Sequence, residues 1–276
     1  CLRSISVSEI QTAWGGWDGL HRWAPVGDNY VFPDHVENLV LKRGPMPLLI
    51  GNCKDEQLLR YMDQLQQDPH FLNEWTRQST AQHFSSLFEL KFYNNSALVR
   101  QQGLDAYVNS LPYADQDHVS WVLDSIQLDS EMIFIGPTYR EAMNFRHVGS
   151  PVYLYSFDYL APGAMPLLNA SFRGVPHTWE LQYLFGFPGT SEGGWQVTSD
   201  DIATMNNFGL YWANFVNYGN PTPASSATIW PQLGTNGEYM IIGPAPRPAT
   251  NFHPKAATFW ACTVPTTEGY RPAWCP

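Results

Sequence analysis

The sequence lacks the features of several large classes of protein. No run of about 18 apolar residues occurs in its 276 residues, so we expect no helix that spans a bilayer. Basic residues are few, with 15 lysines and arginines against 25 aspartates and glutamates, and they form no cluster. Because phosphate backbones are bound by clustered basic side chains, the net charge of -10 argues against a nucleic-acid partner.

Cysteine is also scarce, with four residues at positions 1, 53, 262 and 275, which allow three complete pairings. Cys262 and Cys275 bracket a tail rich in proline, glycine and threonine, and a disulfide between them would fix a segment with little core of its own. The sequons at Asn94 and Asn169 are typical of glycosylation sites. These features predict a secreted protein, extracellular or lumenal, that is glycosylated and carries a disulfide.

The sequence does contain enough apolar material for a large folded domain. Hydrophobic residues make up 44% of the chain and aromatic residues 14%, which favours a packed core over disorder. Short apolar runs bounded by proline or glycine alternate with stretches of three- and four-residue periodicity, which predicts one α/β domain over residues 1–276. Strands are predicted at 48–50, 151–157 and 238–242, and helices within 54–130 and at 131–146, 177–185, 199–218 and 254–262, after an irregular segment at 1–45.

Two side chains stand where an α/β sheet collects functional groups. Glu56 follows the predicted strand at 48–50, and functional side chains gather beyond the carboxyl ends of strands. Taken alone, Glu56 also fits an ordinary acidic first turn of a helix. His177 lies at a loop-to-helix junction, where it is either a general base or a helix-start histidine held by Glu180. An acid after a strand, then a histidine on a later loop, is the order of the last two members of a serine–acid–histidine triad.

The segments around both residues resemble the type-B carboxylesterase and cholinesterase family. Gly51 to Glu56 (GNCKDE) is similar to the family's Gly-x-x-Lys-x-Glu segment, which carries the triad acid. Gly174 to Glu180 (GVPHTWE) is similar to the segment that carries the histidine base, with an acidic residue three positions later. Similar segments at 211–221 and 259–260 extend the resemblance over nearly the whole chain. It implies the C-terminal half of a single α/β-hydrolase domain, with a mixed sheet and many helical insertions.

The family's nucleophile is a serine in a Gly-x-Ser-x-Gly turn that precedes the acid by well over a hundred residues. Only 55 residues precede Glu56 here, and none of them forms this motif. Residues 189–193 match the pattern but follow the histidine, so we interpret Ser191 as part of a surface loop. The resemblance therefore implies a partner: the N-terminal half of the same hydrolase, as a separate chain or a missing segment, which supplies the serine and the oxyanion hole. Cys1 matches a family cysteine that pairs upstream, and we expect it to bond that half.

The implied activity is hydrolysis of a small carboxylic ester through an acyl-enzyme, with no metal or cofactor. His177 would be the base, and Glu56 would orient it. Phe172 and Trp179 are candidates for the substrate pocket, although both also fit an apolar core. A choline ester is disfavoured, because residues 57–60 supply no aromatic ring for a quaternary ammonium.

The alternative is a non-catalytic adhesion or structural protein of the same fold, in which the triad is commonly broken. The presence of both Glu56 and His177 favours the enzyme. Half of a sheet would expose a long edge and apolar faces, so we expect obligate association with the other half through a large apolar interface. Cys53 is interpreted as a buried thiol, and Gly136 and Ala257 stand where the family has a further disulfide.

Overall fold

The structure is a computed structural model, and it divides the chain into two compact units, Cys1–Gly44 and Pro45–Pro276. It describes residues 4–14, 27–34, 36–68, 70–87, 95–164, 173–186, 188–189, 194–223 and 228–276. Five residues singled out in the sequence lie outside the described residues, so the expectations for them stay predictions: Cys1, Asn94, Asn169, Phe172 and Ser191.

The described residues of the first unit form two helices where the sequence predicted an irregular segment, so that prediction was wrong. α1 spans Val7–Trp14 and α2 spans Val36–Lys42. The backbone amide of Ser6 donates to the Glu9 carboxylate at 2.9 Å, and the amide of Glu9 donates to the Ser6 hydroxyl at 3.2 Å. This reciprocal pair caps the first turn of α1, and it explains how a helix forms without a sustained apolar period.

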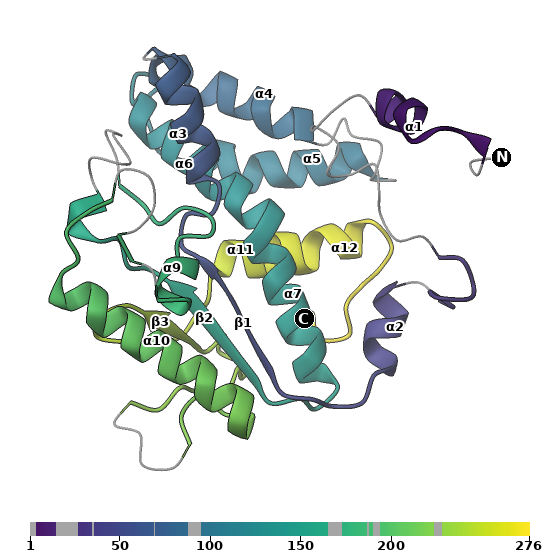
Figure 1. The fold of residues 1–276 in the computed structure, drawn as a ribbon. Helices are drawn as coiled ribbons and strands as arrows, with labels where there is room; N and C mark the ends of the chain where they lie inside the picture. The colour runs from purple at the N-terminus through teal and green to yellow at the C-terminus, as the bar shows by residue number, and fades with distance from the viewer. Residues whose placement is uncertain are drawn as a thin grey trace. The chain divides into compact units, whose positions relative to one another are not determined.

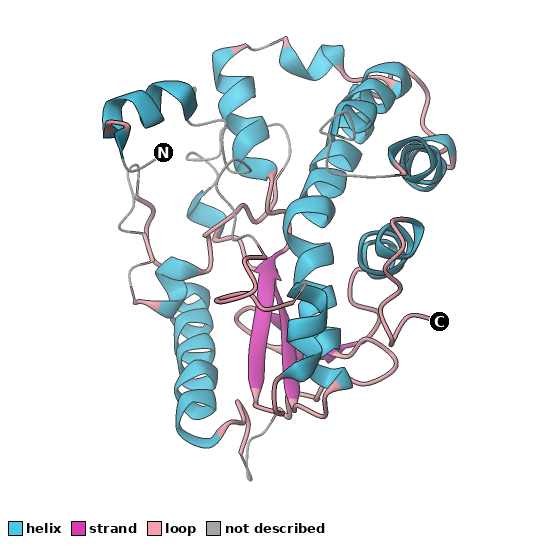
Figure 2. Ribbon diagram, turned by 90° about the vertical axis from the view of Figure 1, so that its right-hand side faces the viewer, coloured by secondary structure: helices cyan, strands magenta, loops and turns pink. Residues whose placement is uncertain are grey.

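The described residues of the second unit form a mixed four-stranded sheet, which contains the three predicted strands and is mixed as the resemblance implied (Figure 2). Its strands, in spatial order, are β1 (Leu48–Cys53), β2 (Val152–Phe157), β3 (Tyr239–Ile242) and β4 (Arg247–Ala249). β1, β2 and β3 run parallel, and β4 pairs antiparallel with β3. β1 continues three residues beyond the predicted Ile50. β4 was not predicted, because three residues that include Pro248 show no strand period.

Helical segments fill the connections between the strands (Figure 1). Those between β1 and β2 are α3 (Leu58–Gln67), the 3-10 turn η2 (Phe71–Glu74), α4 (Arg77–Leu87), α5 (Ser96–Leu104), the π-helical η3 (Asp105–Asn109), α6 (His118–Ser130), the π-helical η4 (Glu131–Ile135) and α7 (Gly136–His147). Between β2 and β3 lie the 3-10 turn η5 (Pro162–Ala164), α9 (Leu181–Leu184) and α10 (Ser199–Tyr218). After β4 come α11 (Pro254–Thr258), the π-helical η6 (Phe259–Thr263) and α12 (Val264–Thr267).

Both faces of the sheet are covered by helices, with α10 on one side and α7 on the other in Figure 1. Successive side chains of a strand point to opposite faces. Tyr155 and Phe157 of β2 pack with Phe208 of α10, whereas Leu154 packs into the core that contains the helices after β1. All six residues of β2 are buried, which is why five of them are apolar or aromatic, with Ser156 as the exception.

α10 has the bounds that the sequence predicted, because its ends are specified locally. The Thr198 side chain accepts from the Asp201 backbone amide, and the Asp201 side chain accepts from the amide of Thr198. Gly219 ends the helix with a φ of 65°, a left-handed conformation that glycine adopts without a Cβ clash. α10 leads away from the carboxyl ends of β1 and β2, where the candidate site lies.

Candidate active site

Glu56 is held in the turn that connects β1 to α3. Its Oε1 accepts a hydrogen bond of 2.8 Å from the backbone amide of Cys53, the last residue of β1. The next amide, that of Gln57, donates to the Ser130 hydroxyl at 2.9 Å. The Glu56 residue is only 4% exposed. The strand end therefore fixes both the position of this carboxylate and the direction of its free oxygen.

The segment that carries His177 is joined to the Glu56 turn by three hydrogen bonds. The amide of Asp55 donates to the Val175 carbonyl at 3.0 Å, and the amide of His177 donates to the Glu56 carbonyl at 3.1 Å. The Val175 amide donates to Asp55 Oδ2 at 2.9 Å. Gly174 allows this close approach, since a Cβ there would lie 2.7 Å from Asp55 Oδ2. Two segments about 120 residues apart are thus aligned as neighbouring strands would be.

The side chains of Glu56 and His177 are in contact at the end of these hydrogen-bonded segments. His177 Nδ1 lies 2.6 Å from Glu56 Oε2. An ionised carboxylate can only accept, so Nδ1 carries a proton, and in the neutral imidazole with this tautomer the lone pair is on Nε2. The His177 side chain is 44% exposed, whereas the Glu56 side chain is 4% exposed. The contact that the sequence predicted is present, and the imidazole is partly exposed.

The backbone at this position also corrects a prediction. Thr178 has a φ of 65°, which lies outside the right-handed helical region. Residues 177–180 therefore form turns, and α9 spans only Leu181–Leu184 in place of the predicted helix at 177–185. His177 thus contacts Glu56 from a turn and not from a helix.

Burial and hydrogen bonding have opposite effects on the pKa of Glu56. Burial raises the pKa of the Glu56 carboxyl above its usual value, and the nearby Glu180 carboxylate adds to the rise. The hydrogen bonds from His177 and from the Cys53 amide oppose it. A buried carboxylate is costly unless it is paired or hydrogen-bonded, so these two hydrogen bonds stabilise the ionised form of Glu56.

Cys53, whose amide binds Glu56, also contacts a second carboxylate near the Glu56–His177 pair. Cys53 is a free, buried cysteine, as interpreted from the sequence, and its Sγ lies 2.7 Å from Glu180 Oε2. Burial raises the pKa of the Cys53 thiol well above its usual value, and the charges of Glu180 and Glu56 add to the rise. The thiol therefore stays protonated and donates to Glu180. No pattern in the sequence indicated this thiol–carboxylate contact, which joins residues 127 positions apart.

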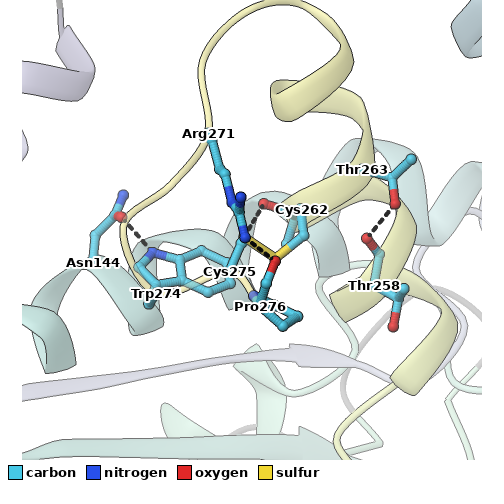
Figure 3. The surroundings of a disulfide bond; sticks show 9 residues. Asn144, Thr258, Cys262, Thr263, Arg271, Trp274, Cys275 and Pro276 are labelled. Carbon is cyan, nitrogen blue, oxygen red and sulfur yellow. Dashed lines mark hydrogen bonds between the residues drawn. A yellow bond between two sulfur atoms is a disulfide. The ribbon is translucent and has the colours of Figure 1, made fainter.

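Two further sequence predictions fall on described residues. The Trp179 ring stacks on that of Trp195, with centroids 5.3 Å apart and an angle of 18° between planes. This contact makes Trp179 part of the packing beside α9, and its predicted contact with substrate stays a prediction. Cys262 and Cys275 form the predicted disulfide, and the indole of Trp274 donates to Asn144 of α7 at 2.9 Å (Figure 3).

The helices hold another histidine–carboxylate pair. His83 Nε2 lies 2.8 Å from Asp129 Oδ1, and the Tyr61 hydroxyl donates to Asp129 Oδ2 at 2.9 Å. The His83 side chain is 20% exposed and that of Asp129 is 1% exposed. These residues belong to α4, α6 and α3, not to the segments that follow the strands. We interpret the pair as a structural contact between helices, and it offers a matched control for the pair at the sheet.

Comparison with known proteins relates this geometry to a family. The model of the carboxylesterase family matches residues 1–260. The chain belongs to the carboxylesterase family. It is 26% identical over 272 residues to an acetylcholinesterase of Bungarus fasciatus, a match that covers 89% of this chain and 40% of that protein. It is 25% identical over 279 residues to carboxylesterase 4A of Bos taurus (94% of this chain, 48% of that protein), and 26% identical over 270 residues to liver carboxylesterase 1F of Rattus norvegicus (94% and 44%).

Membership in the carboxylesterase family confirms the resemblance that the segments around Glu56 and His177 indicated. The chain spans less than half the length of these relatives. Within the described part of this family member, no helix is both long and apolar enough to cross a bilayer. The same residues contain no group of three or more histidine, cysteine or acidic side chains arranged to hold a metal ion.

Proposed function

We propose that this chain contributes the acid and the base of a serine carboxylesterase, with Glu56 and His177 acting on a nucleophile outside the chain. The observation that carries the proposal is the 2.6 Å contact between His177 Nδ1 and the buried Glu56 carboxylate, beyond the carboxyl end of β1. This is where α/β sheets collect their reactive groups. Family membership supports a hydrolase that acts on esters.

In the proposed reaction, His177 Nε2 takes the proton of the serine hydroxyl while the serine oxygen attacks the ester carbonyl. His177 then returns the proton to the leaving alcohol, which leaves the acyl group on the serine. In the second half, His177 takes a proton from water as the water oxygen attacks the acyl carbonyl. His177 then returns that proton to the serine oxygen as the bond to the acyl carbon breaks, which releases the acid and regenerates the serine. Glu56 holds the tautomer with Nδ1 protonated and balances the charge of the imidazolium in both halves. This chemistry needs no metal or cofactor.

The same proposal includes a partner, the N-terminal half of the hydrolase. Among the described residues, only β2 pairs with β1. The amides of Leu48 and Lys54 donate toward β2, so the alternation along the strand turns those of Leu49 and Gly51 to the other edge. A parallel strand added there would place the residues that follow it beside Glu56 and His177. We therefore propose that the serine turn and the oxyanion hole enter along this edge, through a large apolar interface.

Two other functions compete with a general carboxylesterase. A choline ester stays disfavoured, because the first turn of α3 offers no exposed ring: Leu58 is buried and Leu59 is aliphatic. Because one relative is an acetylcholinesterase, the hydrolysis of choline esters is included in the assay below. A non-catalytic adhesion protein is not favoured, because the relatives carry enzyme names and the Glu56–His177 contact is intact.

We also propose that the protein is exported and glycosylated. The Cys262–Cys275 disulfide supports this, since such bonds persist in oxidising compartments. Treatment of the natively produced protein with an N-glycosidase, followed by mass spectrometry of the peptides that carry the two sequons, tests it. Peptides without glycan from a secreted sample would contradict the glycosylation.

A fluorophosphonate probe tests the catalytic proposal on the full polypeptide that carries this chain. The wild type should lose ester hydrolysis as a single serine is labelled, and His177→Gln should label at least about 10³-fold more slowly. His83→Gln removes the histidine of the other carboxylate pair and should label at the wild-type rate. Wild-type protein that is folded but neither labelled nor active on short-chain, long-chain or choline esters would refute the proposal. Equal labelling of His177→Gln would refute the assignment of the base.

A further inference from the structure

An aromatic side chain from a distant helical segment lies against the imidazole of His177. The ring of Phe134 is 4.6 Å from the His177 ring, centroid to centroid, and the two planes are tilted by 36°. Phe134 belongs to η4, the π-helical segment that continues α6. The ring is half-buried, and it contacts the imidazole of the proposed base.

The same helical segment also contacts the turn that carries the acid. Ser130, the last residue of α6, is fully buried and accepts the amide of Gln57, next to Glu56. Its hydroxyl proton is used in a 2.7 Å bond to the Ile126 carbonyl, so its lone pair is directed at Gln57. Ser130 and Phe134 are four positions apart, and residues at this spacing lie on the same face of a helix. One face of α6 and η4 thus contacts both the acid turn and the base.

A single hydrogen bond at Nδ1 leaves the imidazole free to rock about the line from Nδ1 to the carboxylate. Such rocking would swing Nε2 away from the hydroxyl that it must deprotonate, and a displacement of about 1 Å is enough to slow a reaction. A ring packed against one imidazole face blocks that motion.

We propose that Phe134 is a positioning residue for the hydrolysis, which fixes the plane of the His177 imidazole. This inference rests on the proposed function, in which His177 is the base. It predicts that Phe134 acts on the rate constants of both acylation and deacylation, because the same imidazole serves both, while substrate affinity is unaffected.

The test uses the full polypeptide and three variants. Phe134→Leu keeps an apolar side chain of similar size but removes the ring, and should lower kcat and the fluorophosphonate labelling rate constant roughly two- to tenfold with KM unchanged. Phe134→Tyr keeps the ring and should restore rates to within about twofold of the wild type. Phe215→Leu is the matched control. It is another half-buried phenylalanine, and it packs on Tyr153 near the amino end of β2, away from His177.

The fraction of sites labelled at completion separates geometry from folding. The proposal requires that Phe134→Leu reach the same final labelling as the wild type, but at a slower rate. A labelling rate constant for Phe134→Leu equal to that of the wild type would overturn the proposal, whether final labelling is full or reduced. Phe134 would then have only a structural role. An equal loss in Phe215→Leu, or a Phe134→Tyr variant as slow as the leucine variant, would also overturn it. If the wild type does not label, or if His177→Gln labels normally, the proposed function fails and this inference fails with it.

Discussion

Replacing Glu56 with glutamine should separate catalysis from stability, because the change keeps the shape of the side chain and reverses one hydrogen bond. In Glu56→Gln, the amide oxygen can still accept the Cys53 amide in place of Oε1, which now does so at 2.8 Å. The amide NH₂ then faces His177 Nδ1, where Oε2 now lies at 2.6 Å. A donor at that point requires Nδ1 to accept, so the imidazole proton moves to Nε2.

The expected magnitude follows from this change of tautomer. With its proton on Nε2, the imidazole cannot take the serine proton, and a fall in kcat of roughly 10³- to 10⁴-fold is expected for such a change in a triad. The stability of the folded state, in contrast, should not fall. Because burial raises the pKa of Glu56, the ionised carboxylate disfavours the folded state at neutral pH, and a neutral amide removes that cost. The free energy of unfolding at pH 7 should therefore equal or exceed that of the wild type.

The assay pairs the fluorophosphonate labelling rate with urea unfolding of the same samples at pH 7. Asp129→Asn makes the same acid-to-amide change in the His83 pair and should leave the labelling rate unchanged. A Glu56→Gln protein that labels within about tenfold of the wild type would refute the orienting role of the acid. A protein that loses activity only because it unfolds would refute the electrostatic reasoning.

Three further predictions concern stability. Burial lowers the pKa of His253 to about 4 from 6.5, so the neutral imidazole carries no stability cost above pH 6.5, and the folded state loses stability as the pH falls toward 4. The variant His253→Asn removes this titration, and asparagine tolerates the φ of 35° at this position. In urea titrations, it should reduce the loss of unfolding free energy between pH 7 and 4 by about 2–3 kcal/mol. Replacing Cys262 and Cys275 together with alanine should lower the free energy of unfolding by about 3 kcal/mol, measured against the oxidised wild type, and no change would mean that the tail is held by other contacts. Gly51→Ala places a Cβ 2.3 Å from the ring of Tyr155 and should cost about 2–3 kcal/mol in a thermal or urea melt, whereas a neutral result would show that β1 can shift.

The elements that the sequence predicted well are those with signals contained in a few adjacent residues. β2 is a short segment rich in aromatic residues that follows a proline, and α10 has a capping box at one end and a left-handed glycine at the other. The failures have the opposite character. β4 is defined by its pairing with β3, and the turn at 177–180 depends on a positive φ at Thr178, which no propensity indicates.

The sequence alone determined the chemistry that is available: which carboxylate and which imidazole belong to the family's segments, and which cysteines close the C-terminal tail. Local order and residue type carry this information. The tertiary structure decided what touches what, because hydrogen bonds across 121 residues depend on strand register and not on neighbouring sequence. The Glu56–His177 contact of 2.6 Å, the Cys53 thiol against Glu180 and the Phe134 ring on the base all arise where β1, η4 and the segment after β2 converge.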